Sequence, residues 1–439
     1  MKSSEKIVII GSSVAAISAI ETIREKNKNL PITVITKDTD LFYSRPLISY
    51  TNFTDEQCYY RDKNFFRKNN VDLIFGEAMS VKNSSVVLKN KGYIKPCVIS
   101  ARSEMKSYSH FTRSLDNKKN VKFSKLLIAV GGKPIIPSNI AGINGKNVFT
   151  LTTIEDADNI KKFCKNKKHA VVIGCGMIGI KSAEFLKCLG LDVSIVELMD
   201  KPFASVLDDK SGKIIADEIK KHAKLILNNS VYEIKENQCI LKNGEKISAD
   251  IVICAIGVVP NLDIAKKSQI KTNRGIVVDK FMRTSRKNIY AAGDCTEAMD
   301  ILSGKKMPIP IWPVAYRQGA VAGSNIAEII MEYAGGFGRN SVDVFGLPLI
   351  TLGLSNEKSG EEIVFSDEKS KVYKKVIVKD GKIIGAIFIG DISRAGIFTG
   401  MIKDGIDVSN FKNEIFSENF GYIYVPKEFR SKEVTPIEI

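Results

Sequence analysis

The sequence contains few histidines, one tryptophan and no pair of cysteines at the spacing of a redox or zinc motif. Its 439 residues include 3 His and 1 Trp, and its 8 Cys are scattered without a C-x-x-C. Three histidines leave little material for a histidine-rich metal centre or a histidine-based catalytic triad. Scattered cysteines favour buried thiols in a reducing compartment over a disulfide framework. We therefore predict no metal site and a cytoplasmic location.

Long hydrophobic runs are also missing. No stretch approaches the roughly 20 apolar residues that a membrane-spanning helix needs. Residues 7–20 have the polarity of the hydrophobic part of a signal peptide, but Gly11, Ser12 and Ser13 stand where a strand would turn into a helix. We interpret this stretch as part of the folded protein and predict no membrane span.

Acidic residues are scarce relative to basic ones. The 65 Lys and Arg exceed the 49 Asp and Glu, which gives a net charge of +16. Such an excess favours an acidic partner, a nucleotide or an anionic surface, although lysines scattered over a solvated surface give the same number. The basic residues form no aromatic-interleaved patch, so we predict no nucleic-acid binding. The 44% hydrophobic and 26% charged content is ordinary for a globular protein, and the length predicts roughly three domains.

Two segments repeat one pattern of strand, Gly/Ser turn, amphipathic helix and second strand. The first starts as IVIIGSSVAAISAI at 7–20 and reaches ITVIT at 32–36, and the second starts as HAVVIGCGMIGI at 169–180 and reaches DVSIVE at 192–197. Short β-branched strands that are apolar on both faces are typical of parallel sheets covered by helices. The sequence therefore predicts an α/β fold with two Rossmann-like dinucleotide-binding domains.

The second turn, Gly174-Cys-Gly176-Met-Ile-Gly179, carries the stronger fingerprint. Its glycines allow a tight turn, the approach of the backbone to a pyrophosphate, and close packing of helix against strand. The helix start offers free N–H groups and partial positive charge to phosphates. Glu197, at the end of the next strand, would accept hydrogen bonds from a ribose 2′-OH and repel a 2′-phosphate, so we predict that NADH is preferred over NADPH. Ile178 belongs to the same predicted site.

The first turn, Gly11-Ser-Ser13-Val-Ala-Ala16, carries a weaker fingerprint. Ser13 replaces the second glycine, and Ala16 replaces the third. The next strand ends in Thr36, where an acid is usual, and Asp38 is the substitute that we expect. By itself this copy predicts only a mediocre nucleotide site.

From about residue 336 the sequence no longer follows the pattern of strand, glycine turn and helix. Residues 373–391 predict a β-hairpin with Asp380-Gly381 at its turn, and a helix is expected from Ser393. We expect an FAD-type domain at 1–148 and 267–335, an inserted NADH-type domain at 149–266, and a C-terminal α+β domain at 336–439. The polar residues 98–124 are expected to form a loop or an insertion.

Seven segments, in this order and spacing, make a family resemblance specific. They begin at Gly11 and continue with FYSRPLIS at 42–49, AVGGKP at 129–134, the turn at 174–179, AIGVVPN at 255–261, AAGDC at 291–295 and IWPVAYRQGAVAGSNIA at 311–327. The chain resembles the FAD-dependent pyridine nucleotide oxidoreductases of the glutathione-reductase fold. Within them it is similar to the branch of NADH:rubredoxin reductases and of the flavin domain of assimilatory nitrite reductases, for which GDISRAG, here at 390–396, is typical. The similarity covers about residues 6–335 and, more loosely, the C-terminal domain.

The resemblance implies FAD at the first turn and NADH at the second. It implies that Gly11 and the amides from Ser12 to Ala16, Ala15 included, hold the FAD pyrophosphate. Arg45 would lie near the phosphates or the flavin, and the backbone of Val81 would meet the adenine.

The resemblance also assigns roles at strand ends. Gly131 would pack against the FAD, Asp294 would accept hydrogen bonds from the ribityl chain, and the helix that contains Gln318 would direct its positive end at the flavin. The predicted cofactor-binding set is completed by Ala129, Lys181 and Gly257.

The cysteines of the disulfide-reducing relatives are missing. Those relatives carry a redox-active pair, and peroxidase or oxidase relatives carry one reactive cysteine after the segment that corresponds to 42–49. Here residues 48–51 read Ile-Ser-Tyr-Thr, Cys58 follows later, and no cysteine follows Cys295. We therefore predict direct chemistry, in which a hydride passes from NADH to FAD and the electrons go on to an external acceptor. No catalytic side chain is identified.

Lys181 departs from the family pattern, because relatives often carry Glu there, close to flavin and nicotinamide. Either this lysine stabilises an anionic reduced flavin or it is a solvated helix residue, and both alternatives stay open. Ser13, Thr36 and Val130 depart from the pattern on the FAD side, which leaves loosely held FAD as an open alternative.

The expected function is that of an NADH-dependent flavoenzyme. Its acceptor would be an acidic electron-transfer protein such as rubredoxin or ferredoxin, or a partner enzyme, because the positive net charge suits an acidic partner. One alternative is an oxidase or reductase of a small acceptor, such as oxygen, nitrite or a quinone, and another is a non-catalytic flavin-binding subunit. The C-terminal domain is typically a dimerisation or docking element in this fold, so a homodimer is expected.

Overall fold

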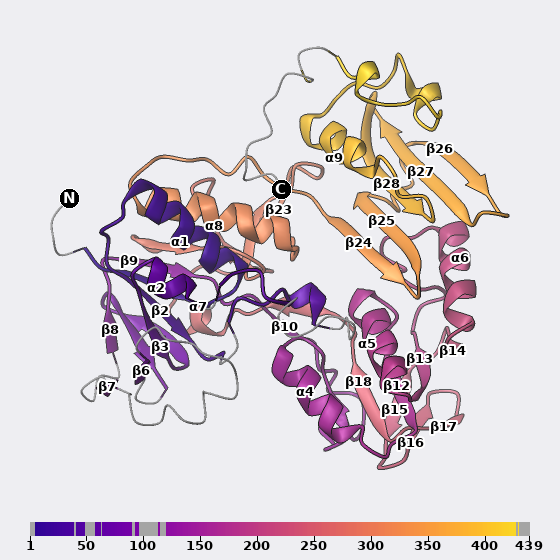
Figure 1. The fold of residues 1–439 in the computed structure, drawn as a ribbon, viewed down its shortest axis with the longest axis horizontal. Coiled ribbons are helices and arrows are strands. Elements are labelled where there is room, and N and C mark those ends of the chain that lie inside the picture. Colours follow the sequence, from indigo (N-terminus) through magenta and orange to yellow (C-terminus); the bar gives the residue numbers. More distant parts are fainter. Residues whose placement is uncertain are drawn as a thin grey trace. The chain divides into compact units, whose positions relative to one another are not determined.

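The computed structural model describes residues 5–38, 41–48, 58–62, 64–89, 93–95, 113–114, 120–426 and 429 (Figure 1). Most of the loop predicted at 98–124 lies outside these residues. Contacts divide the chain into two compact units. Unit 1 comprises Met1–Ser44, Phe53–Lys133 and Val259–Gly336, and unit 2 comprises Arg45–Asn52, Pro134–Val258 and Phe337–Ile439. Two short strands at the crossing points, β10 (Gly132–Pro134) and β19 (Val258–Pro260), form a two-stranded sheet.

Unit 1 is built on a largely parallel sheet. Its strand order is β21 (Ile289–Ala291), β9 (Lys125–Ile128), β1 (Ile7–Ile10), β2 (Ile32–Thr36), β3 (Val71–Phe75), β6 (Tyr93–Lys95) and β7 (Arg113–Ser114). The pairs from β21 to β3 are parallel, and β6 and β7 pair antiparallel. Every residue of β1 is buried, as the predicted two-sided apolar strand requires.

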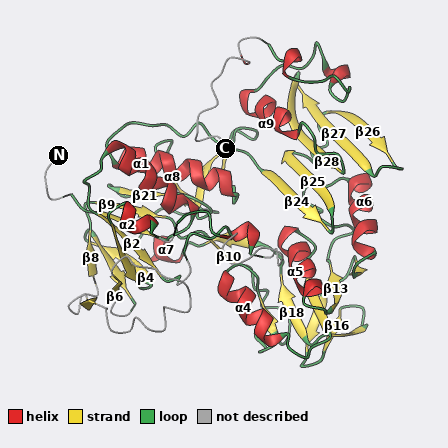
Figure 2. Ribbon diagram, in the orientation of Figure 1, coloured by secondary structure: helices red, strands yellow, loops and turns green. Residues whose placement is uncertain are grey.

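Two helices of unit 1 pack against each other unusually closely. They are α1 (Val14–Lys26) and α8 (Trp312–Ile326), which lie side by side next to the sheet (Figure 2). A Cβ atom placed on Gly319 would lie 2.2 Å from the carbonyl oxygen of Ala15, and one on Gly323 would lie 2.6 Å from that of Ala19. Glycine therefore lets the two backbones meet.

Smaller elements complete unit 1. One sheet is formed by β4 (Ala78–Lys82), β5 (Ser85–Leu88) and β8 (Asn120–Lys122), and another by β20 (Ile276–Val277), β22 (Thr296–Met299) and β23 (Lys306–Met307). Two short helices are α2 (Phe65–Lys68) and α7 (Asp263–Lys267).

Unit 2 contains a second parallel sheet. Its order is β11 (Val148–Phe149), β18 (Ile251–Cys254), β12 (His169–Ile173), β13 (Asp192–Val196) and β14 (Lys224–Ile226), and all its pairs are parallel. Its helices are α4 (Ile154–Phe163), α5 (Met177–Cys188) and α6 (Asp209–Lys220), and a small antiparallel sheet adds β15 (Val231–Ile234), β16 (Gln238–Leu241) and β17 (Lys246–Ser248). The short 3-10 turn η1 (Arg45–Leu47) also belongs to this unit.

The C-terminal part of unit 2 is an antiparallel sheet followed by a helix. The order is β24 (Arg339–Val344), β25 (Leu347–Gly353), β28 (Lys382–Ile389), β27 (Val372–Lys379) and β26 (Glu361–Asp367), and α9 (Ala395–Asp404) and the turns η4 (Lys412–Glu414) and η5 (Tyr422–Tyr424) follow. The predicted hairpin is confirmed, since β27 and β28 pair antiparallel and both Asp380 and Gly381 have positive φ. The predicted fold class is confirmed as well. The domain boundaries expected from the sequence stay a prediction.

The antiparallel sheet shares one hydrophobic core with the nucleotide-type sheet of unit 2. A buried polar contact reinforces this core. Asp208, at the start of α6, accepts from the Nζ of Lys375 at 2.7 Å and from the hydroxyl of Tyr373 at 2.8 Å. The side chain of Lys375 is fully buried, so the two parts of unit 2 are joined by apolar and charged groups alike.

Candidate nucleotide sites

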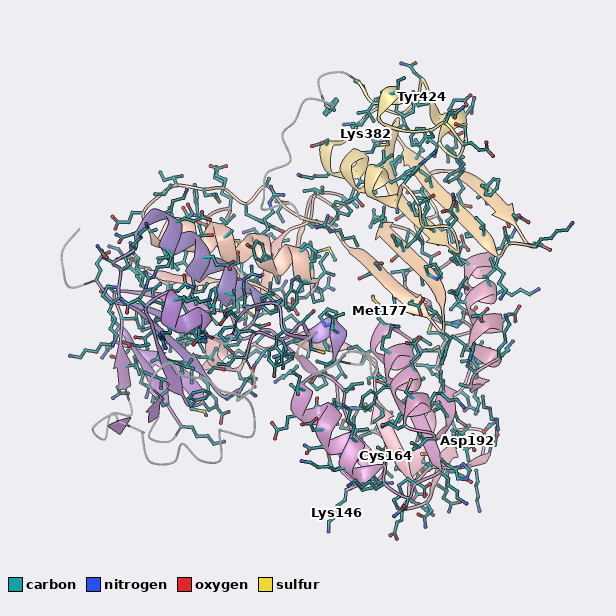
Figure 3. The ribbon with its side chains drawn as sticks, viewed as in Figure 1. Lys146, Cys164, Met177, Asp192, Lys382 and Tyr424 are labelled. Carbon is teal, nitrogen blue, oxygen red and sulfur yellow. The ribbon has the colours of Figure 1, made fainter. Side chains whose placement is uncertain are left out.

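The glycines of the turn at 174–179 meet three different surroundings. Gly174 has φ +101, and a Cβ there would lie 2.6 Å from the carbonyl oxygen of Ala255. A Cβ on Gly179 would lie 2.1 Å from the carbonyl oxygen of Gly174, whereas one on Gly176 would meet no atom within 4 Å. Gly176 caps α5 without a side-chain hydrogen bond, and Met177 begins that helix (Figure 3). The open space lies at the helix N-terminus, where phosphate binding is favoured.

Glu197 is fixed beside this turn. One carboxylate oxygen accepts the N–H of Cys175 at 2.6 Å, and the other accepts the N–H of Met199 at 2.9 Å. The carboxylate is thus held against the glycine turn by backbone donors. Oxygen lone pairs that remain on a carboxylate can still accept hydroxyl protons.

Gly257 lies at the same edge of the sheet. It follows β18, has φ +117, and its carbonyl oxygen accepts the N–H of Ile135 at 3.0 Å. The turn at 174, Glu197 and Gly257 therefore follow the carboxyl ends of three neighbouring parallel strands, β12, β13 and β18. Ligands of open α/β sheets bind at this edge. Ile178 is half-buried in the first turn of α5.

Lys181 is buried, with 7% of its surface exposed. Its Nζ lies 2.6 Å from Oε2 of Glu184, and the Oε1 of Glu184 accepts the N–H of Phe345 at 2.7 Å. The solvated alternative for this lysine is therefore wrong. Lys181 instead forms an ion pair with Glu184 within α5. Glu184 in turn binds the backbone N–H of Phe345, which lies between β24 and β25.

In unit 1 the turn at Gly11 resembles the turn at Gly174, and it leaves even less room for a side chain. Gly11 has φ +110, and a Cβ there would lie 2.2 Å from the carbonyl oxygen of Ala129. Ser13 caps α1 without a side-chain hydrogen bond, and Ala15 and Ala16 are buried in the first turn of the helix. The start of α1 therefore presents N–H groups that no capping side chain occupies, which fits a pyrophosphate.

β2 ends in Thr36, at the position where dinucleotide-binding folds usually carry an acidic residue. The hydroxyls of Ser12 and Thr36 lie 3.0 Å apart in the interior, and Oγ1 of Thr36 accepts the N–H of Asp38 at 3.1 Å. Asp38 is half-buried. Thr36 thus fixes the segment that carries Asp38.

Other strand ends of unit 1 meet this turn. A Cβ on Gly131, which has φ +66, would meet no atom within 4 Å, so the space there is open. Asp294 is half-buried and follows Gly293, whose N–H is held by Oε1 of the buried Gln318 at 2.8 Å. Gln318 thus connects the loop of Asp294 to α8, whose cap residue Ile311 makes no side-chain hydrogen bond. These features of unit 1 fit a bound FAD. In the same way, the open space beside Gly176 in unit 2 fits a bound NADH.

Arg45 and Val81, which are also predicted cofactor residues, have protein partners as well. The guanidinium of Arg45 donates to the carbonyl oxygen of Thr152 at 3.0 Å, within unit 2. The N–H of Val81 donates to the Ser268 hydroxyl at 2.7 Å, and the carbonyl oxygen of Val81 accepts from Arg286 at 3.1 Å. The N–H of Val81 is therefore already used, whereas its carbonyl oxygen has a second lone pair that could still accept a hydrogen bond from an adenine. This role stays a prediction.

None of the cysteines in the described segments forms a disulfide bond. Burial, and then the neighbouring Glu197 carboxylate, raise the pKa of Cys175 far above its usual range. Burial raises the pKa of Cys295 to about 12. These two thiols, which lie in the loops at the predicted nucleotide sites, therefore stay protonated near neutral pH and are poor nucleophiles.

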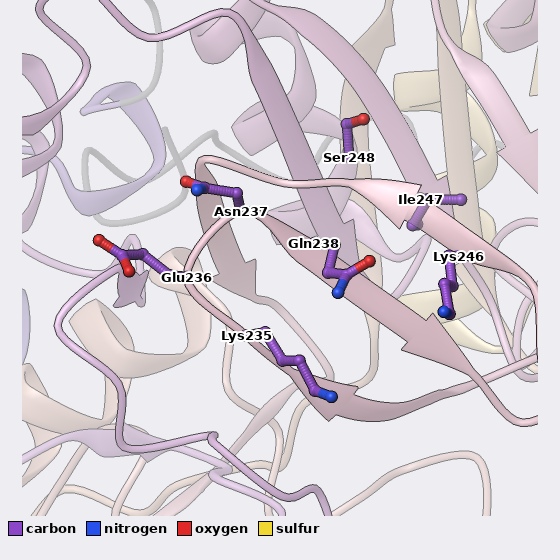
Figure 4. A pocket seen from close by; sticks show the side chains of 7 residues that line it. All are labelled: Lys235, Glu236, Asn237, Gln238, Lys246, Ile247 and Ser248. Carbon is purple, nitrogen blue, oxygen red and sulfur yellow. The ribbon is translucent and has the colours of Figure 1, made fainter.

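A separate open hollow of about 400 Å³ lies on the small antiparallel sheet of unit 2 (Figure 4). It is lined by Lys235, Glu236, Asn237, Gln238, Lys246, Ile247 and Ser248. None of the predicted cofactor residues lines it, and its polar, shallow walls do not resemble an enclosed ligand pocket.

The described residues offer no cluster of three or more His, Cys, Asp or Glu side chains that could hold a metal ion. Among the described helices, none has both the length and the apolar character to cross a membrane.

Sequence reasoning missed three residues that organise these sites. The spacing of Glu184 from Lys181 is a helical i,i+3 pair, which could have suggested the ion pair. Ser268 and Arg286 could not have been found in this way, because they reach Val81 across 187 and 205 residues of sequence.

Comparison with known proteins gives two family matches. Residues 5–319 match the family described as pyridine nucleotide-disulphide oxidoreductase. Residues 339–406 match the domain described as rubredoxin NAD+ reductase C-terminal domain. The two matches together span both units.

Similar individual proteins include an NADH-rubredoxin oxidoreductase of Clostridium acetobutylicum, which is 30% identical over 94% of this chain and 97% of its own. An NADH oxidase of Methanocaldococcus jannaschii is 29% identical over 96% of this chain and 95% of its own. The crystal structure of the NADH:rubredoxin oxidoreductase from Clostridium acetobutylicum matches with a TM-score of 0.71 and 28% identity, over 93% of this chain and 97% of that one.

Proposed function

Because the chain belongs to the pyridine nucleotide-disulphide oxidoreductase family, we propose that this flavin-dependent NAD(P)H oxidoreductase oxidises NADH and passes the electrons to an electron-transfer protein. The observation that carries the NADH part is the open space at Gly176 beside the fixed carboxylate of Glu197. The acceptor part is supported by the match of residues 339–406 to a rubredoxin reductase domain and by the similarity to an NADH-rubredoxin oxidoreductase.

Each unit supplies one part of the chemistry. When bound in unit 1, FAD would accept a hydride from NADH and release electrons to an acceptor. The protein's own contribution is to bind and orient. The uncapped starts of α1 and α5 would hold pyrophosphates, and the loop of Asp294, fixed by Gln318, would hold the ribityl hydroxyls.

Glu197 favours NADH over NADPH in this proposal. Both of its oxygens are held by backbone N–H groups, so the carboxylate cannot easily turn away from a ribose bound beside the turn. A 2′-phosphate would place like charges together, which is unfavourable. The nearby Lys201 is paired with Asp209 and does not offer its charge freely to a phosphate.

The test is an anaerobic titration of the purified protein. Its visible spectrum should show a bound flavin that bleaches with near-stoichiometric NADH, and NADPH should require a much higher concentration. In a Glu197→Gln variant, the concentrations of NADH and NADPH that bleach the flavin should differ less than in the wild type. A flavin that NADH does not bleach would refute the proposal and favour a non-catalytic flavin-binding subunit.

A second candidate function is the reduction of a small acceptor such as oxygen, nitrite or a quinone. The similarity to an NADH oxidase favours it. Rapid oxygen consumption by the protein with NADH alone would support this candidate, and turnover only after rubredoxin is added would support the protein acceptor.

We further propose a cytoplasmic location and a homodimer, both expected from the sequence. Light scattering during size-exclusion chromatography measures the mass directly, and a monomer at micromolar concentration would contradict the homodimer.

A further inference from the structure

The chain between β13 and α6 leaves the glycine turn of unit 2 and then returns to it. It starts after Glu197, whose carboxylate accepts the N–H of Cys175 at 2.6 Å. Further along, Phe203 donates its N–H to the carbonyl oxygen of Cys175 at 3.1 Å. Both backbone groups of this turn residue are therefore held by the same stretch of chain. We define residues 198–207 as the rim segment.

The first part of the rim segment presents two apolar side chains to solvent. Leu198 and Met199, directly after Glu197, are 66% and 50% exposed. Their backbone is fixed, because the carbonyl oxygen of Met199 accepts the N–H of Asn228 at 3.0 Å. An adenine base attached to a ribose at Glu197 would remove both side chains from water, which is favourable.

The second part of the rim segment is buried in the core that unit 2 shares with the C-terminal sheet. Phe203 is 5% exposed, Leu207 is fully buried, and both belong to this core. Phe203 has a φ of +49°, which a bulky residue adopts rarely. Such a conformation persists only where the surrounding packing imposes it. The course of the rim segment therefore depends on a core that the C-terminal sheet helps to form.

Two side chains of the C-terminal part also bind the backbone of the rim segment directly. The hydroxyl of Ser355 donates to the carbonyl oxygen of Val206 at 2.8 Å, and Nδ2 of Asn356 donates to that of Ala204 at 3.3 Å. Ser355 is 1% exposed, so water does not compete for its bond. These two bonds hold the rim segment from the side of the C-terminal sheet.

The turn that carries Ser355 and Asn356 is itself firmly placed. It follows β25, and the N–H of Leu354 donates to the carbonyl oxygen of Ile384 in β28 at 2.9 Å. A Cβ on Gly385 would lie 2.4 Å from the carbonyl oxygen of Leu354, so a glycine in β28 lets the turn approach this closely. The two donors are therefore offered to the rim segment by a rigid support.

We propose that the C-terminal sheet takes part in NADH binding, with Ser355 and Asn356 as positioning residues that hold the rim segment against the adenosine half of the nucleotide. A segment that is fixed beforehand loses little conformational entropy on binding, whereas a released one must be ordered at that moment. The inference rests on the proposed function in that NADH is the ligand of the turn at 174–179.

The test measures the binding of ADP-ribose, which contains the adenosine and pyrophosphate of NADH and no nicotinamide, to the oxidised flavoprotein by calorimetry. The variant Ser355→Ala/Asn356→Ala should bind ADP-ribose about tenfold more weakly than the wild type, because the rim segment loses two hydrogen bonds. An unchanged affinity, or no binding of ADP-ribose to the wild type, would overturn the proposal.

The matched control is Asn340→Ala/Ser341→Ala. It removes the same two residue types from β24, where the amide of Asn340 donates to the hydroxyl of Thr351 within the sheet. Its affinity for ADP-ribose should stay within about twofold of the wild type. An equal loss in the control would mean that any damage to the C-terminal sheet has this effect, and would overturn the proposal.

A second ligand separates positioning from general damage. Reduced nicotinamide mononucleotide lacks the adenosine half, so it should bleach the flavin of the Ser355→Ala/Asn356→Ala variant at the rate of the wild type. NADH should reach the same limiting rate only at a higher concentration. Losses of equal size with both ligands would contradict a role through the adenosine half.

A further variant, Leu198→Ser/Met199→Ser, changes only exposed side chains and should keep the melting temperature of the wild type. It should bind ADP-ribose several-fold more weakly, and an unchanged affinity would overturn the contact of the rim segment with adenosine. Failure of the proposed function is recognised separately. A wild-type flavin that NADH does not bleach would refute that function, whereas the ADP-ribose comparison, which needs no electron transfer, would still decide the role of the rim segment.

Discussion

At the scale of single residues, the three glycines of the turn at 174–179 have distinct physical roles. Gly174 needs its positive φ, Gly179 needs to be small against the backbone, and Gly176 faces open space. Only Gly176 is therefore free for a ligand. The sequence motif does not distinguish these three roles, whereas the surroundings of each glycine in the structure do.

Substitution of these glycines by alanine should separate binding from stability. Gly176→Ala should change the free energy of unfolding by less than about 1 kcal/mol, because its φ of −88° suits alanine and the new methyl group meets no protein atom. It should weaken NADH binding at least about tenfold, by occupying the space beside the pyrophosphate. Gly179→Ala should destabilise the fold by about 1–3 kcal/mol through overpacking.

Thermal unfolding and anaerobic NADH titration of both variants check this. Equal NADH affinity in Gly176→Ala and the wild type would contradict the assignment of the open space to the nucleotide.

The pair of Lys181 and Glu184 leads to a second residue-scale prediction. Glu184→Gln removes the negative charge that the buried ammonium group of Lys181 contacts, and should destabilise the protein by roughly 2–4 kcal/mol. The double variant Lys181→Met/Glu184→Leu should cost less than that, because no uncompensated charge remains. Chemical denaturation of the wild type and both variants measures the differences. If the double variant loses more stability than Glu184→Gln, the pair is not a compensated buried charge.

At the scale of elements, the start of α6 carries one of the contacts that join the antiparallel sheet to the nucleotide-type sheet of unit 2. Burial alone would raise the pKa of Asp208, but hydrogen bonds from Lys375, Ser211 and Tyr373 outweigh it and lower that pKa to about 2. Tyr373, by burial and by its bond to Asp208, has a raised pKa and stays protonated as a donor. Together with the shared hydrophobic core, this contact holds the C-terminal sheet against the nucleotide-type sheet.

Stability should therefore depend on pH through Asp208. A carboxyl group whose pKa is lower in the folded state stabilises the fold above its unfolded pKa, near 3.8, and loses this contribution as the pH falls towards about 2. The loss should amount to about 2 kcal/mol for this group.

The measurement is urea unfolding of the wild type and Asp208→Asn between pH 5 and pH 2.5. Asp208→Asn should be less stable at pH 5, and its stability should fall less steeply with acid. Parallel pH profiles would show that Asp208 does not carry the effect.

At the scale of the whole molecule, the two units divide the work and the charge unequally. Each contains a glycine turn at the carboxyl edge of a parallel sheet, yet nearly all of the net charge belongs to unit 1. If the acceptor is an acidic protein, turnover with rubredoxin should fall as the salt concentration rises, because exposed charges are screened, while flavin reduction by NADH should not.

The sequence by itself determined the family, the α/β fold, the two glycine turns and the C-terminal hairpin. These features depend on local patterns, such as buried β-branched strands, glycine spacing and the Asp380-Gly381 turn, and local patterns can be followed along a chain. The sequence also indicated an oxidoreductase that uses a flavin and a pyridine nucleotide, and the family match confirms this. The preference for NADH and the individual site residues stay predictions.

Only the tertiary structure decided which partners the polar residues have. Lys181 is buried against Glu184, the backbone of Val81 is held by Ser268 and Arg286, and Asp208 meets Lys375 of the C-terminal sheet. The total of +16 could be counted from composition, but its concentration in unit 1 could not. The reason is the same in each case: hydrogen bonds and ion pairs act over a few ångströms, and the fold alone brings residues that are up to about 200 positions apart within that range.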